Sequence, residues 1–181
     1  QIYTGDEIKP AVSVVYNGEA LVPDKDYEIS GYKNNTNVTT GSVKAEITVK
    51  GIGKYEGTQT VKFDILPAPI DGAVVDGYED SVTYTGAAIG FESLSVTVDG
   101  RTLVNGTDYE VKYENNTNAS TDDKNAKIII TAKDGGNYTG EVSREFTILP
   151  KSIEECEVGQ IDGQIYTGSA LNPDVVVKDG S

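Results

Sequence analysis

The side chains of this chain that could take part in chemistry are carboxylates, tyrosines and one cysteine. The 181 residues include 29 Asp and Glu, 11 Tyr and Cys156, but no His, Trp or Met. Without histidine there is no imidazole base, no Ser-His or Cys-His nucleophile pair and no His-ligated metal. Cys156 has no second cysteine for a disulfide or a thiolate cluster, and it is flanked by Glu155 and Glu157. We therefore expect no enzyme activity.

The carboxylates raise the question of calcium, which binds to oxygen ligands. Asp122, Asp123 and Asp134 are the candidate metal ligands. The first two lie in a stretch, Ser120 to Lys124, where we place two extra residues relative to the matching part of the chain. No segment fits the twelve-residue calcium loop with its fixed glycine and terminal glutamate. The alternative is a solvated acidic face without metal, and no other cofactor is expected.

The charge balance excludes one class of partner. With 15 Lys and Arg against 29 Asp and Glu, the formal net charge is 15 − 29 = −14. Nucleic-acid binding depends on a basic face that displaces counterions, so we expect no nucleic-acid partner. The apolar runs are only a few residues long, so we expect no membrane insertion.

Tyrosines could bind a ligand, because sugars and peptides stack on aromatic rings. Most of them recur at matched positions along the chain, which favours burial in a core or corner with the hydroxyl bonded to the backbone. For the same reason we do not expect a glycosidase cleft, although two carboxylates would suffice for that chemistry. Tyr16 and Tyr78 have no counterparts and are the candidate ligand-binding residues. The recurring tyrosines are Tyr3, Tyr84 and Tyr166; Tyr27 and Tyr109; Tyr32 and Tyr113; Tyr55 and Tyr138.

These matches belong to an internal repeat. The tripeptide Tyr-Thr-Gly begins at Tyr3, Tyr84 and Tyr166, with spacings of 84 − 3 = 81 and 166 − 84 = 82 residues. Further landmarks follow the first two tripeptides in one order, and chance does not explain the agreement. They are Asn17-Gly18 and Asp99-Gly100; Asp26-Tyr27 and Asp108-Tyr109; Asn34–Asn37 and Asn115–Asn118; Gly53–Gly57 and Gly136–Gly140; Phe63–Pro67 and Phe146–Pro150.

The repeat defines the expected domains. The first copy, residues 1–67, lacks its opening strand; the second copy, residues 68–150, is complete; the third copy, residues 151–181, is the truncated start of another unit. In the third copy we expect strands at about Glu157 to Tyr166 and Pro173 to Lys178. Because exposed strand edges attract partners, we expect residues 151–181 to pack against the second copy or to exchange a strand head-to-tail with another molecule.

Hydrophobic patterning predicts strands. Val43 to Lys50 alternates apolar and polar residues, and Ala126 to Lys133 keeps one apolar face. Asn17-Gly18 and Asp99-Gly100 are typical of two-residue hairpin turns, and Ser152 to Val158 is the one candidate for a helical turn. The Asn-Asn-Thr-Asn segments suit left-handed turns, although their amides could also bind a glycan or calcium. We predict an all-β chain of tandem, Ig-like β-sandwich repeats of about 80 residues; the alternative is a β-grasp-like unit, which needs a helix that we cannot place.

The order of landmarks resembles the Ig-like or MBG-type tandem repeats of cell-surface proteins of Gram-positive bacteria. The resemblance covers essentially the whole chain and involves YTG, DYE, NNTN, GNYTG and FTI motifs. It implies an extracellular, often wall-attached protein whose repeats act as stalk or adhesive modules. We expect the partners of these repeats to be neighbouring repeats of the parent protein. Such proteins sometimes contain a Lys-Asn isopeptide crosslink, but the partner of Lys62 in the second copy is Glu145, which excludes a crosslink shared at that position.

Two functions from different classes fit these observations. The first is a non-catalytic spacer or stalk, in which the prolines after each Ile-Leu-Pro stiffen the junctions and acidic charge keeps the segments soluble. The second is an adhesive module that binds a glycan or a host surface protein through Tyr16 or Tyr78.

Overall fold

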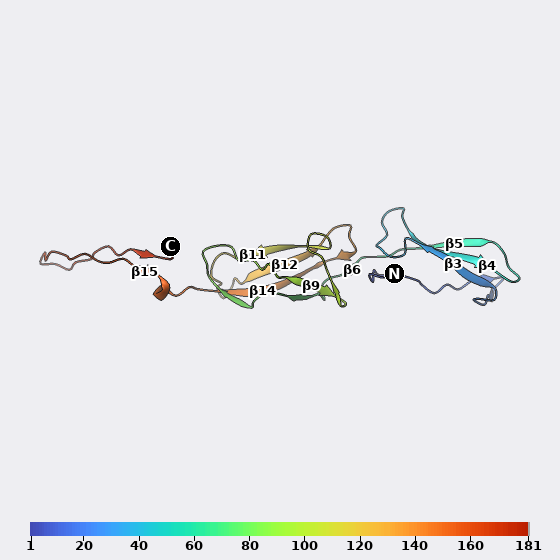
Figure 1. Cartoon of the computed structure of the whole chain (residues 1–181), viewed down its shortest axis with the longest axis horizontal. Coiled ribbons are helices and arrows are strands. Elements are labelled where there is room, and N and C mark those ends of the chain that lie inside the picture. The colour runs from blue at the N-terminus through green and yellow to red at the C-terminus, as the bar shows by residue number, and fades with distance from the viewer. Residues whose placement is uncertain (181) are drawn as a thin grey trace. The chain divides into compact units, whose positions relative to one another are not determined.

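The computed structural model describes residues 1–180 and is an all-β structure (Figure 1). These residues form sixteen strands in several small sheets and one 3-10 turn, η1 (Ile153–Glu155). The turn lies inside the segment for which the sequence predicts one, so that prediction is confirmed. Residues 1–180 contain no α-helix, the element that a β-grasp unit requires.

In the first copy, a hairpin precedes a three-stranded antiparallel sheet in the order β3-β4-β5. Ile2 adds a parallel bridge to Leu66. The strands are β1 (Val15–Tyr16), β2 (Glu19–Ala20), β3 (Tyr27–Lys33), β4 (Ala45–Gly51) and β5 (Thr58–Phe63).

In the second copy, one sheet has the order β10-β9-β7 and another has the order β11-β12-β14-β8, in which β14 and β8 are parallel. A short parallel pair joins β6 to β13, and the third copy contributes the antiparallel pair β15 and β16. The remaining strands are β6 (Ala68–Pro69), β7 (Val74–Asp76), β8 (Ser81–Thr83), β9 (Ser95–Val98), β10 (Arg101–Thr102), β11 (Tyr109–Glu114), β12 (Ala126–Ala132), β13 (Tyr138–Thr139), β14 (Glu141–Leu149), β15 (Glu157–Val158) and β16 (Val177–Lys178).

The predicted alternation determines which side chains are buried. In β12 every second residue is buried, from Ala126 through Ile128 and Ile130 to Ala132. β4 follows the same pattern from Ala45 onwards. Since successive side chains of a strand point to opposite faces, one face of each sheet enters the core and the other meets solvent.

Turn chemistry also agrees with the sequence. Asn17 and Gly18 have φ of 50° and 86°, and Asp99 and Gly100 have φ of 49° and 78°. Positive φ at both central residues is the requirement of the two-residue hairpin, whose flanking pairs are seen in β1-β2 and β9-β10. The first Asn of each Asn-Asn-Thr-Asn segment, Asn34 or Asn115, is also left-handed.

The landmarks make the same hydrogen bonds in both copies, which corrects one part of the alignment. The amide of Asn34 donates to the carbonyl of Lys44, and that of Asn115 donates to Asn125. Both spans are ten residues, so the second copy has no insertion between Ser120 and Lys124, contrary to our expectation. The insertion lies after β12: the bond from Gly51 to Gly57 spans six residues and the matching bond from Ala132 to Gly140 spans eight. The sequence was misleading because neither loop has a hydrophobic pattern.

The described chain divides into two compact units, and the boundary between them passes through β11, β12 and β14. The first unit contains the small core of Ile8, Ala45 and Ile65, against which Tyr3 and Phe63 pack. The first unit comprises Gln1–Gly77, Ser93–Lys112 and Ile129–Arg144; the second comprises Tyr78–Glu92, Tyr113–Ile128 and the described residues from Glu145 onwards.

Candidate functional site

The two candidate ligand-binding tyrosines each pack against another ring. Tyr16, in β1, is 58% exposed, and its ring centroid lies 5.8 Å from that of Tyr55 in an edge-to-face arrangement. Tyr78 is half-buried and lies edge-on to Phe91 at 6.1 Å. The two belong to different compact units. Of the two, Tyr16 offers the larger free aromatic surface.

The three candidate calcium ligands are not brought together. Asp122 and Asp123 lie in the turn bridged by Thr121 and Lys124, before β12, whereas Asp134 follows the end of that strand. A strand of seven residues spans about 23 Å, and ligands of one calcium ion all lie about 2.3–2.6 Å from it. Among residues 1–180, no group of three or more acidic, Cys or His side chains is arranged to hold a metal ion.

Three of the recurring tyrosines, Tyr27, Tyr109 and Tyr138, are buried, and the others in the first two copies are half-buried. Tyr27 is 5% exposed and its hydroxyl donates to the carbonyl of Val12 at 2.8 Å. Tyr109 is 2% exposed, and burial, with Asp108 nearby, raises the pKa of its hydroxyl. In the third copy, Tyr166 is 84% exposed. The buried hydroxyls are part of the packing and are not available to a ligand.

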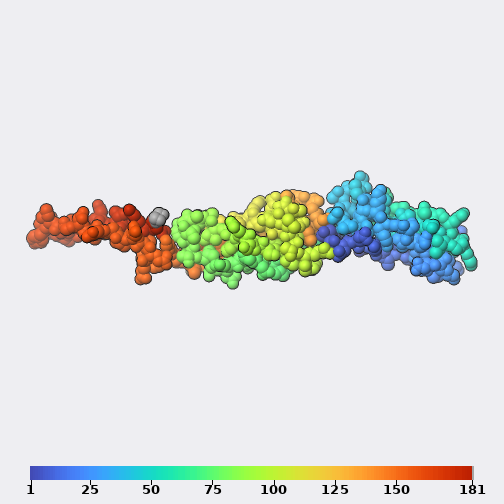
Figure 2. Space-filling view, in the orientation of Figure 1, coloured from blue at the N-terminus to red at the C-terminus, as the bar shows by residue number. Residues whose placement is uncertain are grey.

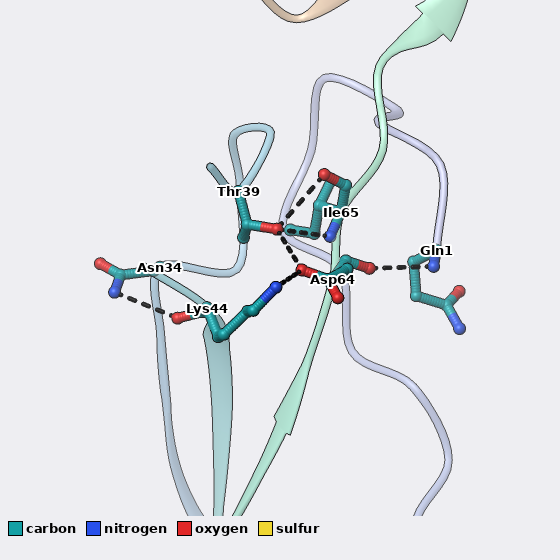
Figure 3. A network of polar contacts seen from close by, with 6 residues as sticks. All are labelled: Gln1, Asn34, Thr39, Lys44, Asp64 and Ile65. Carbon is teal, nitrogen blue, oxygen red and sulfur yellow. Dashed lines mark hydrogen bonds and ion pairs between the residues drawn. The ribbon is translucent and has the colours of Figure 1, made fainter. Parts of the chain in front are cut away.

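A polar network closes the end of the first copy (Figure 3). The Asp64 carboxylate accepts from Lys44 Nζ at 2.5 Å and from Thr39 Oγ1 at 3.1 Å. These two hydrogen bonds hold the pKa of Asp64 below its usual value. Thr39 Oγ1 in turn accepts from the Ile65 N–H at 3.0 Å, and the amino terminus at Gln1 donates to the Asp64 carbonyl. Each donor ties a segment outside the strands to the residues that follow β5, so the network is structural.

An ion pair on the sheet surface also has a structural role, and its two charges are exchanged between the first and second copies. Lys62 of β5 pairs with Glu46 of β4 at 3.2 Å, whereas in the second copy Glu145 of β14 pairs with Lys127 of β12 at 3.3 Å. The residues exchange sign but keep their complementarity. A position that tolerates this exchange supports cross-strand attraction and not a reaction that needs one chemical group.

The contact with the most specific geometry is the repeat junction, where Tyr3, Asn37 and Val38 of the first copy meet Asn137 and Tyr138 of the second. Asn137 and Tyr138 also contact Ala68, the first residue of the second copy. All of these residues belong to the first compact unit, and the N-terminal segment, dark blue in Figure 2, lies beside the orange segment that follows β12. The Tyr3 and Tyr138 rings meet edge-to-face with centroids 5.4 Å apart.

Hydrogen bonds fix the same contact. The side chain of Asn137 accepts from the Val38 N–H at 3.0 Å and donates to Asn37 Oδ1 at 3.1 Å. Its carbonyl accepts from the Ala68 N–H at 3.0 Å, within the parallel pair β6-β13. Tyr138 is 9% exposed, and burial together with the neighbouring Tyr3 raises the pKa of its hydroxyl.

An ion pair is added beside the junction. Arg101 Nη2, just after the second hairpin turn, lies 2.5 Å from Asp6 Oδ2, just after the first Tyr-Thr-Gly. The pair raises the pKa of the Arg101 guanidinium. In the other copies the matching positions differ: the first hairpin turn is followed by Glu19 and the second Tyr-Thr-Gly by Ala87.

Sequence analysis missed the junction, because it treated the Gly-x-Tyr-x-Gly landmark as internal packing. Two signals were present. Asn137, which can donate and accept at once, stands where the first copy has Lys54, and Asp6 and Arg101 are opposite charges at landmarks whose counterparts do not match. Such copy-specific residues mark contacts made by one copy alone.

Comparisons with known proteins give no assignment: no family model, no curated protein and no solved structure matches this chain. Within residues 1–180, no helix has the length and apolar character needed to cross a membrane.

Proposed function

We propose that this chain is a non-catalytic, extracellular repeat segment that acts as a spacer in a bacterial cell-surface protein. In this proposal the repeat unit is a small Ig-like β-sandwich, and residues 1–67, 68–150 and 151–181 are successive units, of which the second is complete. The role of such a segment is to hold other parts of the protein apart, which requires that adjacent units resist bending.

The observation that supports the proposal is the repeat junction. A flexible linker would leave Pro67 to Pro69 solvated, whereas here Ala68 is 6% exposed and pairs in β6-β13 with Tyr138. The junction combines amide, aromatic and ionic contacts between the two copies with the backbone pairing of β6 and β13 at the start of the second copy. Each is modest alone, but together they add to the restriction that the prolines place on the linker.

A second candidate function, adhesion to a glycan or a host protein, is favoured by the exposure of Tyr16. Tyr16 is 58% exposed and its ring lies beside that of Tyr55; aromatic rings with an apolar body and a polar tip are enriched at interfaces. Tyr78 is the other candidate, although most of its surface is already covered.

A binding screen separates the two functions. The chain is applied to a glycan array and used in pull-downs with host surface proteins. The spacer proposal predicts no ligand that binds more tightly than about 1 mM. One reproducible ligand that is lost on Tyr16→Ala or Tyr78→Ala, but kept on Tyr166→Ala, would contradict it and establish adhesion.

A further inference from the structure

The end of the second copy contains a hollow at the place that corresponds to the repeat junction. This terminal hollow has a volume of about 400 Å³ and belongs to the second compact unit. Its lining includes Tyr84, Asn118, Ala119, Pro150, Lys151 and Ile153.

The lining matches the first half of the junction residue by residue. Tyr84 stands at the position of Tyr3, which stacks on Tyr138. Asn118 and Ala119 stand at the positions of Asn37 and Val38, which bond to the Asn137 side chain. The hollow therefore repeats a surface whose partner is known from the same chain.

Residues that are buried at the repeat junction are more exposed at the terminal hollow. In the junction, Ala68 and Ile70 are 6% and 0% exposed, and their N–H groups donate to the carbonyls of Asn137 and Thr139. Their counterparts in the third copy are Lys151, which is half-buried, and Ile153, which is 70% exposed. An exposed isoleucine beside an apolar hollow indicates a surface built to be covered.

We propose that the terminal hollow binds a Gly-x-Tyr-x-Gly turn of the kind that fills the junction, and that the turn Gly53–Gly57 of a second copy of this chain binds there. The corresponding turn of the second copy, at Tyr138, is already engaged within its own chain. Tyr55 is half-buried and stacks on Tyr16 at one side, so its ring takes the place of Tyr138 against Tyr84.

Charges at the two surfaces are complementary. Lys54 and Glu56 flank Tyr55, and the hollow is bordered by Asp179 and Lys151, whose charged atoms lie 2.6 Å apart. One junction contact is not reproduced: Lys54 donates to the Asn118 side chain but, unlike Asn137, cannot accept from the Ala119 N–H. The contact is therefore a weaker version of the junction.

Because donor and acceptor are different surfaces, the association is head-to-tail. It goes beyond the spacer proposal by naming the partner of one surface. The spacer proposal and the head-to-tail association can be refuted independently. A ligand found in the binding screen would overturn the spacer role and would not affect the association.

The test is sedimentation equilibrium of the whole chain at protein concentrations up to about 1 mM, the range for weak contacts. Wild type is expected to associate reversibly, and Tyr84→Ala or Tyr55→Ala is expected to weaken the association about tenfold. Asn118→Ala, at an exposed position, gives a second variant in case Tyr84→Ala perturbs folding, and Tyr166→Ala is the matched control.

Mixing makes the test specific. Tyr84→Ala retains the donor turn and Tyr55→Ala retains the hollow, so an equimolar mixture is expected to form dimers that do not grow further. Lys54→Asn, which restores the missing acceptor, is expected to tighten association several-fold. A wild type that stays monomeric throughout, or association that neither tyrosine variant weakens, would overturn the proposal; the second result would point to strand exchange through residues 151–181.

Discussion

Removing the Tyr138 ring tests whether the repeat junction stabilises the chain. Tyr138 is 9% exposed, and loss of a buried aromatic side chain costs about 3–5 kcal/mol, so Tyr138→Ala is expected near the lower limit, about 3 kcal/mol. Tyr3 is half-buried, and Tyr3→Ala is expected to cost about 1.5 kcal/mol. Because the rings meet edge-to-face, their coupling is expected to be about 1 kcal/mol.

The assay is a double-mutant cycle by urea denaturation, followed by far-ultraviolet circular dichroism. The double variant is expected to lose about 3.5 kcal/mol, less than the 4.5 kcal/mol of the summed single losses, because the shared contact is counted twice in the sum. Tyr55→Ala is the matched control: Tyr55 occupies the same landmark but stacks on Tyr16, so its loss should add to that of Tyr3→Ala. A coupling for Tyr3 and Tyr138 below about 0.3 kcal/mol would refute the reasoning.

Three further predictions concern single features. Lys62→Glu is expected to destabilise by about 0.5 kcal/mol and Glu46→Lys to restore the loss in the double variant, because the second copy has the reversed pair; a double variant no more stable than Lys62→Glu in urea would contradict this. The pKa of Asp64 is lowered by its hydrogen bonds to lysine and threonine. Its stabilising effect is therefore present above the unfolded pKa and is lost as pH falls below about 4. Asp64→Asn should make the free energy of unfolding less dependent on pH in the acid range, and an unchanged pH dependence would refute this prediction. Gly77 and Gly106 have φ of 82° and 80°, but a Cβ at Gly77 would meet the backbone carbonyl of Ser93, in the turn before β9, whereas one at Gly106 meets nothing within 4 Å. Thermal melting should therefore show a larger loss for Gly77→Ala than for Gly106→Ala, and equal losses would count against the clash.

Features with a local cause could be predicted from the sequence. Alternation in Val43 to Lys50 and Ala126 to Lys133 located β4 and β12 to within a few residues, because one buried face requires a period of two. Asn17-Gly18 and Asp99-Gly100 predicted their own turns, because few residues accept positive φ.

Features that depend on contacts between distant residues could not be predicted from the sequence. The alignment misplaced the insertion, since the hydrogen bonds show that the two extra residues lie between Ala132 and Gly140. In the third copy, the long predicted strands are reduced to β15 and β16, with two residues each, because an apolar pattern yields a strand only where a neighbouring strand supplies hydrogen bonds.

For the candidate sites, too, the sequence was informative about local chemistry but not about contacts between distant residues. Composition alone directed attention away from histidine and disulfide chemistry, but residue type could not tell that Asp122 and Asp134 lie at opposite ends of β12. Nor could it reveal the repeat junction, whose partners are about 100 residues apart in the chain. Such contacts are set by the path of the chain, and sequence patterns are local.

The most direct test of the central claim measures the distance across the repeat junction. Spin labels at Ser42→Cys and Thr107→Cys, two exposed positions in the first compact unit, are introduced in a Cys156→Ser background and studied by double electron–electron resonance. A fixed junction predicts one narrow distance distribution that broadens on Asn137→Ala. A broad distribution in the parent protein, unchanged by Asn137→Ala, would contradict the account.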